Sequence, residues 1–250
     1  MLISHKHKFI FIKNTKTGSS SLQTLLGEYC WPDEVEYHFV DHDDIQHKGI
    51  VKSDEVRENF KKYQENKNGI LGYGAETKWT SHLTAKEIKE YIGDEKFNDY
   101  FKFSVVRNPY NKVLSKYFWD MNDHKGEPIE TWVSRGRNAC NLIHHVIPRC
   151  EKTGVPCCDF YIKYENMKED LAKVCNIIGI PNIDFSKLPK NKDLINKESD
   201  LNQMDDFGIK DMFLKYKSSP DAWKEIYTQK EKDIIYKRHQ REFEIFNYEK

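Results

Sequence analysis

The stretch "KFIFIKNTKTGSSSL", residues 8–22, joins a short apolar run to a loop of small polar residues. Phenylalanine and isoleucine fill residues 9–12, which is typical of a strand covered on both faces. From Leu22 onward the apolar residues recur at positions 22, 25, 26 and 29, the spacing of one helix face. The sequence therefore predicts a strand, a tight turn around Gly18 and a helix in direct succession.

The same order recurs further along the chain. Residues 100–106, "YFKFSVV", predict a second buried strand, and Pro109 suits the first turn of the helix that follows. Residues 158–164, "CDFYIKY", predict a third strand, and the helix after it ends near Gly179. Alternating strands and helices indicate an α/β domain with a central, mainly parallel sheet and helices on both faces.

A fourth helix is predicted near the C-terminus, where Thr228 and Glu231 have the spacing of a capping box. No linker or internal repeat separates two self-sufficient sets of strands and helices. We therefore expect residues 1–250 to form a single domain.

Composition excludes several functional classes. Lysine plus arginine and aspartate plus glutamate both number 40, so no global basic field favours nucleic acid. The apolar runs are too short for an integral membrane segment or a signal peptide, so we expect a cytoplasmic protein. Six cysteines are too few for a disulfide scaffold, and their spacing indicates no metal site. Reduced thiols are favoured, although the pairs Cys140 and Cys150 or Cys157 and Cys158 have the potential to oxidise.

The loop after the first strand has the composition of an anion site. A strand that feeds a helix directs free amide hydrogens and the positive end of the helix dipole at one point. Gly18 permits close approach of the backbone, and Lys16 supplies a full positive charge. The hydroxyl groups that can donate to phosphate oxygens belong to Thr17, Ser19, Ser20 and Ser21. The alternative is an ordinary serine-rich turn with a surface lysine.

A second anion site is predicted at the end of the second strand. Arg107 stands where α/β sheets place their ligands, and Ser115 lies about two helical turns further on. A bidentate guanidinium and a hydroxyl can together hold a phosphate. Two such sites suit a nucleotide with phosphates at both ends. The alternative is that Arg107 only caps the sheet edge or forms a salt bridge there.

These residues carry a resemblance. "KTGSSSL" (16–22) resembles the 5′-phosphosulfate loop, and "VVRNPYNKVLSKY" (105–117) resembles the 3′-phosphate motif, of sulfotransferases that use 3′-phosphoadenosine 5′-phosphosulfate (PAPS). The similarity is greatest to the carbohydrate sulfotransferases, of the sulfotransferase family 2 type, and continues in "DFYIKYENMKEDL" and "IIYKRHQREFEIFNY". The resemblance implies a P-loop-like three-layer domain. Two departures are Lys112, where many relatives have arginine, and the lack of a membrane anchor or stem before the first strand.

The resemblance also implies residue roles. It assigns residues 16–21 to the 5′ end of PAPS and Arg107 with Ser115 to its 3′-phosphate. Lys16 is the candidate cation for the charge that develops on the bridging oxygen, and adenosine 3′,5′-bisphosphate is the expected product. His82, in "TSHLTAKEI", resembles the catalytic histidine of sulfotransferases, with Glu76 as the reserve base. The leaving group is already good, so no metal is required.

The acceptor is expected to be a small molecule or glycan with a hydroxyl group. Exposed tryptophans are suited to stack on sugar rings, although tryptophans more often lie in cores. The residues considered are Trp31, Trp79, Trp119 and Trp132. Two other functions remain open: a phosphoryl-transfer enzyme such as a kinase, which the missing Walker loop disfavours, and a non-catalytic nucleotide-binding module.

Overall fold

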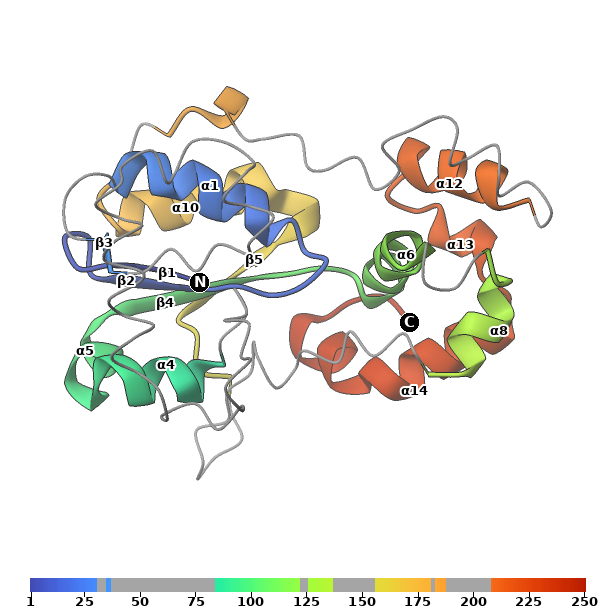
Figure 1. Ribbon diagram of the computed structural model, residues 1–250, viewed down its shortest axis with the longest axis horizontal. Coiled ribbons are helices and arrows are strands. Elements are labelled where there is room, and N and C mark those ends of the chain that lie inside the picture. The colour runs from blue at the N-terminus through green and yellow to red at the C-terminus, as the bar shows by residue number, and fades with distance from the viewer. Residues whose placement is uncertain (31–34, 37–83, 122–125, 137–155, 181–182, 188–207) are drawn as a thin grey trace, which may run out of the picture.

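A five-stranded sheet forms the centre of the chain's larger lobe (Figure 1). The computed structural model describes residues 1–30, 35–36, 84–121, 126–136, 156–180, 183–187 and 208–250. The strands are β1 (Leu2–Ser4), β2 (Phe9–Ile12), β3 (Val35–Glu36), β4 (Phe101–Val106) and β5 (Phe160–Lys163), in the order β3-β1-β2-β4-β5. The three predicted strands are thus β2, β4 and β5.

The centre of the sheet is parallel and one edge is antiparallel. β2 pairs parallel with β4 in the register Phe11 to Phe103, and β4 pairs parallel with β5 in the register Val105 to Ile162. β1 runs antiparallel to both β2 and β3, an arrangement that the sequence pattern did not predict. The parallel arrangement brings the carboxyl ends of β2, β4 and β5 to the same edge of the sheet.

Helices cover both faces of the sheet, as predicted for a three-layer α/β domain. The helices on one face are α1 (Ser19–Cys30) and α10 (Met167–Ile177), and those on the other are α4 (Ala85–Ile92) and α5 (Asp94–Asp99) (Figure 1). Side chains of β2 alternate between these layers: Phe9 and Phe11 pack with α1 and α10, whereas Ile10 and Ile12 pack with α4 and α5. All four are fully buried, which confirms a strand covered on both faces.

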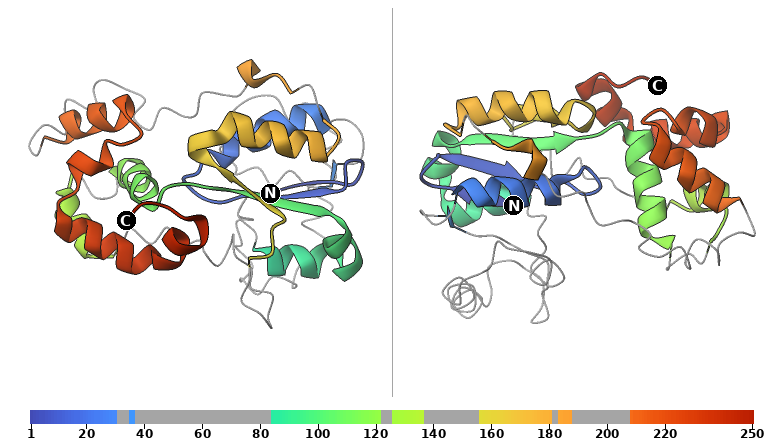
Figure 2. Two further views of the ribbon diagram at one scale, coloured as in Figure 1. Left: turned by 180° about the vertical axis from the view of Figure 1, so that it is seen from behind. Right: turned by 90° about the horizontal axis from the view of Figure 1, so that it is seen from above.

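A second group of helices lies beyond the carboxyl ends of the strands (Figure 2). Its members are α6 (Pro109–Trp119), α8 (Ile129–Ser134), α12 (Ile209–Ser218), α13 (Trp223–Ile226) and α14 (Gln229–Phe246). Their buried faces form one apolar cluster in which Tyr110 stacks on Trp223 at 4.3 Å between ring centroids. β4 leads through Arg107 and Asn108 directly into α6, so this helix connects the sheet to the helical group.

Local signals in the sequence fix the helix ends. The Asn108 side chain accepts hydrogen bonds from the amides of Tyr110 and Asn111, and Pro109 occupies the first helical turn. The predicted capping box of Thr228 and Glu231 is present at the start of α14. Short 3₁₀ turns, η1 (Tyr164–Asn166) and η2 (Phe185–Lys187), complete the described elements.

Candidate functional site

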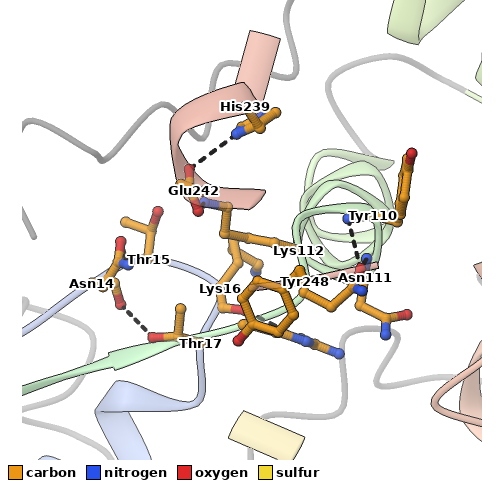
Figure 3. Close-up of polar contacts among 12 residues, drawn as sticks. Asn14, Thr15, Lys16, Thr17, Tyr110, Asn111, Lys112, His239, Glu242 and Tyr248 are labelled. Atoms are coloured by element: carbon orange, nitrogen blue, oxygen red, sulfur yellow. Dashed lines mark hydrogen bonds and ion pairs between the residues drawn. The ribbon is translucent and has the colours of Figure 1, made fainter. Parts of the chain in front are cut away.

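The loop between β2 and α1 is held in one conformation by its own hydroxyl groups. Thr17 Oγ1 donates to the Asn14 carbonyl oxygen at 3.1 Å, and the Ser19 hydroxyl donates to the same oxygen. The Asn14 side chain in turn donates to the Val105 carbonyl on β4 at 3.3 Å. The loop is therefore anchored to the neighbouring parallel strand, and Figure 3 shows Asn14 and Thr17 facing each other across it.

Two residues of this loop have left-handed backbone. Gly18 has a φ of 72°, and a Cβ atom at this position would lie 2.9 Å from Tyr164 Cε2, so the site requires glycine. Lys16 has a φ of 59°, which is uncommon for a residue with a side chain. These conformations turn the chain sharply enough for α1 to begin at Ser19.

The start of α1 offers amide hydrogens to an anion. The first-turn amides of a helix lack intrahelical acceptors, and the first turn of α1 contains no acidic side chain. Ser19 and Ser21 are buried here, whereas Ser20 is exposed. In this structure the hydroxyl groups of Thr17 and Ser19 donate to the Asn14 carbonyl oxygen, so their hydrogens are used within the loop.

Arg107 joins the second predicted site to the first. Its Nη1 donates to the Lys16 carbonyl oxygen at 3.1 Å, and its Nη2 donates to the Tyr216 hydroxyl oxygen at 3.2 Å. The guanidinium also lies over the ring of Tyr164, 4.2 Å from the centroid. Arg107 is only 8% exposed, and its Nε is buried without a hydrogen-bond partner among the described residues. The salt bridge considered as an alternative is therefore not formed within this part of the chain.

Side chains on one face of α6 become more exposed toward the C-terminal end of the helix. Lys112 is fully buried, Ser115 is 5% exposed and Trp119 is 50% exposed, at helical spacings of three and four. The Lys16 ammonium lies over the Trp119 ring, 3.9 Å from its centroid. The loop that carries Lys16 thus lies along α6, and Ser115 occupies the same face.

Lys112, the position at which the motif departs from many relatives, is a structural residue. Its ammonium pairs with the Glu242 carboxylate on α14, and both side chains are almost completely buried. Glu242 Oε1 also accepts from His239 Nδ1 at 3.0 Å, as Figure 3 shows. Burial disfavours the charged Glu242, yet Lys112 and His239 outweigh it and hold the pKa of the Glu242 carboxyl below its usual value.

Three aromatic residues near the loop and Arg107 were not assigned to the cofactor site from sequence. Tyr164 follows β5 directly, so its position at a strand's carboxyl end was a usable signal. Tyr216 comes from α12, far along the chain, and had no such signal. Trp119 was considered only as one of several tryptophans.

Several predicted residues lie outside the described residues: the candidate bases His82 and Glu76, the indoles Trp31 and Trp79, and the thiols Cys140 and Cys150. Neither Cys157 nor Cys158 is part of a disulfide. Within the described ranges, no three or more His, Cys, Asp or Glu side chains are grouped to hold a metal ion. In the same ranges, no helix has the length and apolar character needed to cross a membrane.

The chain is similar in sequence to an archaeal protein and to a protein-family model. An uncharacterized protein of Archaeoglobus fulgidus is 32% identical over 107 residues, which cover 40% of this chain and 84% of the archaeal protein. A model described as the sulfotransferase family matches residues 1–249, which confirms the resemblance noted in the sequence. The match includes the β2–α1 loop, Arg107 and the C-terminal helix alike. The chain belongs to the sulfotransferase family.

Proposed function

We propose that this sulfotransferase moves a sulfuryl group from PAPS to a hydroxyl group of a carbohydrate acceptor. Family membership supports sulfuryl transfer in general. The observation that carries the choice of donor is the hydrogen bond between Arg107 and the Lys16 carbonyl, which couples the two anion-binding elements. A donor with phosphate groups at both ends has the chemistry to occupy both.

The cofactor would be held by the residues of the two motifs. Residues 16–21 bind the 5′-phosphosulfate chiefly through the amides at the start of α1 and the Lys16 ammonium. For the hydroxyl groups of Thr17 and Ser19 to donate to the ligand, they would have to leave the Asn14 carbonyl oxygen. Arg107 and Ser115 bind the 3′-phosphate. A buried guanidinium that meets no carboxylate among the described residues is costly, and a phosphate would supply an anionic partner and engage Nε. This gain favours a doubly phosphorylated nucleotide over one without a 3′-phosphate.

In the proposed reaction His82 would act as the general base and Lys16 would stabilise the leaving group. His82 accepts the proton of the acceptor hydroxyl while that oxygen bonds to sulfur from the side opposite the leaving group. The bond between sulfur and the bridging oxygen breaks, and Lys16 stabilises the negative charge that stays on the 5′-phosphate. Adenosine 3′,5′-bisphosphate leaves, no metal takes part, and residues 1–250 act as one domain.

Ligand-induced stabilisation tests the donor. A ligand that binds only the folded state raises the melting temperature by mass action. Adenosine 3′,5′-bisphosphate should raise it well above the value reached with AMP at equal concentration. Equal shifts would refute a 3′-phosphate site. Transfer from labelled PAPS to sugars, glycans, phenols and lipids then separates an enzyme from a binding module, which would bind the bisphosphate without turnover.

The assignment of the base is tested by His82→Ala. Cofactor affinity should be retained while turnover falls by roughly 10²–10⁴-fold, the usual effect of losing a positioned acid–base group. The acid limb of the wild-type pH–rate profile, which reports protonation of the imidazole that has to accept the proton, should disappear. Near-normal turnover would remove His82 from this role and make Glu76 the next residue to change.

A further inference from the structure

Trp119 is the tryptophan that the structure places at the candidate site. Trp132 is 1% exposed within the apolar cluster of the helical group, where it meets Tyr117 edge-on at 5.4 Å between centroids. Trp223 is also buried, at 3% exposed. Trp119, at the last position of α6, is half exposed. Of these three described tryptophans, Trp119 alone has the surface needed to contact a second molecule.

The position of Trp119 relative to Lys16 locates it near the reacting atoms. The Lys16 ammonium lies 3.9 Å from the centre of the indole, well inside the range of a cation–π contact. In the proposed reaction this ammonium meets the bridging oxygen, and the acceptor oxygen attacks the sulfur beside it. A ring resting on Trp119 would therefore lie close enough to present a hydroxyl group to that sulfur.

The surroundings of Trp119 favour a polar acceptor. Lys116 on α6 and Asp120, the C-cap residue of that helix, form an ion pair with Nζ 2.6 Å from Oδ2, and their side chains are 30% and 14% exposed. Ser115 lies one turn back along the helix. Sites for flat phenols are mostly apolar and enclosed, whereas an exposed indole among charged and hydroxyl groups suits a molecule with many hydroxyls. The electron-rich indole face attracts the positively polarised C–H groups of a sugar ring as it attracts Lys16.

We infer that Trp119 is a specificity-determining residue on which a sugar ring of the acceptor stacks, next to the Lys16 ammonium. This inference rests on the proposed function, because it places the acceptor beside the transferred group. The stacked ring orients one hydroxyl group toward the sulfur, and the Lys116 ammonium beside Trp119 contacts the remaining hydroxyls.

The test compares wild type with Trp119→Leu, which keeps apolar bulk but removes the ring. Both proteins, saturated with adenosine 3′,5′-bisphosphate, are applied to immobilised neutral oligosaccharides that end in galactose, N-acetylglucosamine or N-acetylgalactosamine. Wild type should retain at least one of these glycans, and Trp119→Leu should bind it about tenfold more weakly, since aromatic stacking contributes on this scale. Trp119→Phe should fall between the two.

Two controls separate a loss of stacking from a general loss of surface contact or of donor binding. Ile177→Ala removes an apolar side chain that is 56% exposed on α10 and should leave glycan binding unchanged. The melting-temperature shift with the bisphosphate, measured on the same proteins, reports the donor site independently. A wild type that shifts with the bisphosphate but retains no glycan, or equal retention by wild type and Trp119→Leu, overturns the inference while the donor assignment stands. Trp119-dependent binding of 4-nitrophenol in place of glycans would also overturn it.

Discussion

Arg107 and Lys112, five residues apart in "RNPYNK", are two buried cations in opposite environments. Lys112 meets a carboxylate, that of Glu242, inside the contact between α6 and α14. Arg107 meets a carbonyl oxygen, a phenol hydroxyl and an aromatic face, and one of its nitrogens has no hydrogen-bond partner in the described part of the chain. One charge is neutralised within the protein, whereas the other is held by neutral groups of the described residues.

The difference supports a structural role for Lys112 and the proposed binding role for Arg107. Burying a charge without a counter-ion costs free energy that the fold has to supply. Such an arrangement is expected where an anionic ligand provides the missing partner, because the ligand then gains the full interaction. Lys112 already has the Glu242 carboxylate as its counter-ion, so it does not need an anionic ligand. The contrast therefore assigns Lys112 to the contact between α6 and α14 and not to an anion site.

The largest expected effect comes from breaking the structural pair. Lys112→Ala leaves Glu242 buried without its cation and should lower the free energy of unfolding by about 3–5 kcal/mol, measured by urea denaturation. If the variant does not fold, Glu242→Gln gives a milder form of the same test. The double variant Lys112→Met, Glu242→Leu should recover much of the loss. Weakened binding of adenosine 3′,5′-bisphosphate by a folded double variant would contradict a purely structural role.

Lys16→Ala should affect catalysis more than binding. Loss of the cation at the bridging oxygen is expected to lower turnover by roughly 10²–10³-fold, the usual effect of removing one group that stabilises developing charge. The affinity for PAPS in the absence of acceptor should change far less, because the bridging oxygen carries little charge until its bond to sulfur breaks. Lys168→Ala, on the exposed side of α10, is the matched control. Parallel losses of affinity and turnover would show that Lys16 serves binding alone.

Arg107→Ala should lower the affinity for the ligand, whereas Lys112→Ala should lower the stability of the fold. Affinity for the bisphosphate should fall by about 1.5–3 kcal/mol, the contribution of a charge-assisted hydrogen bond, as measured by calorimetry. The unliganded protein should lose little stability, since the variant also removes a buried charge that the described residues do not neutralise. Unchanged affinity in a folded variant would overturn the 3′-phosphate assignment and remove the contrast with Lys112.

The smallest expected effect concerns acid sensitivity at the structural pair. Burial lowers the pKa of His239 below its usual value of about 6.5, against the hydrogen bond to Glu242. As pH falls, His239 therefore binds a proton in the unfolded chain before it does so in the folded protein. The contribution of neutral, buried His239 to stability is full above the pKa of the unfolded chain and is lost as pH falls below it. Glu242, whose pKa is also lowered, adds a loss at more acidic pH. His239→Gln should flatten the dependence of the melting temperature on pH between about 7 and 5; an unchanged slope would contradict this origin.

Much of the fold was predictable because its signals are local. Residues 9–12 show the composition of a doubly covered strand, and Asn108 and Pro109 mark the start of α6 within the motif itself. The predicted strands at 100–106 and 158–164 are found at Phe101–Val106 and Phe160–Lys163, a difference confined to the ends. β1 was not predicted because three residues, "LIS", are too few to show a period.

The sequence by itself determined the order of strands and helices and the positions of the two proposed anion-binding motifs, because periodicity, caps and loop composition act over a few residues. Only the tertiary structure decided what each charge meets. Arg107 reaches Tyr216 across 109 positions and Lys112 reaches Glu242 across 130, pairings that depend on how α12 and α14 pack against α6. The same packing leaves Trp119 exposed beside Lys16 while it buries Trp132. Burial and partner choice are properties of three-dimensional contact, so two cations of one motif meet different partners and two tryptophans differ in exposure.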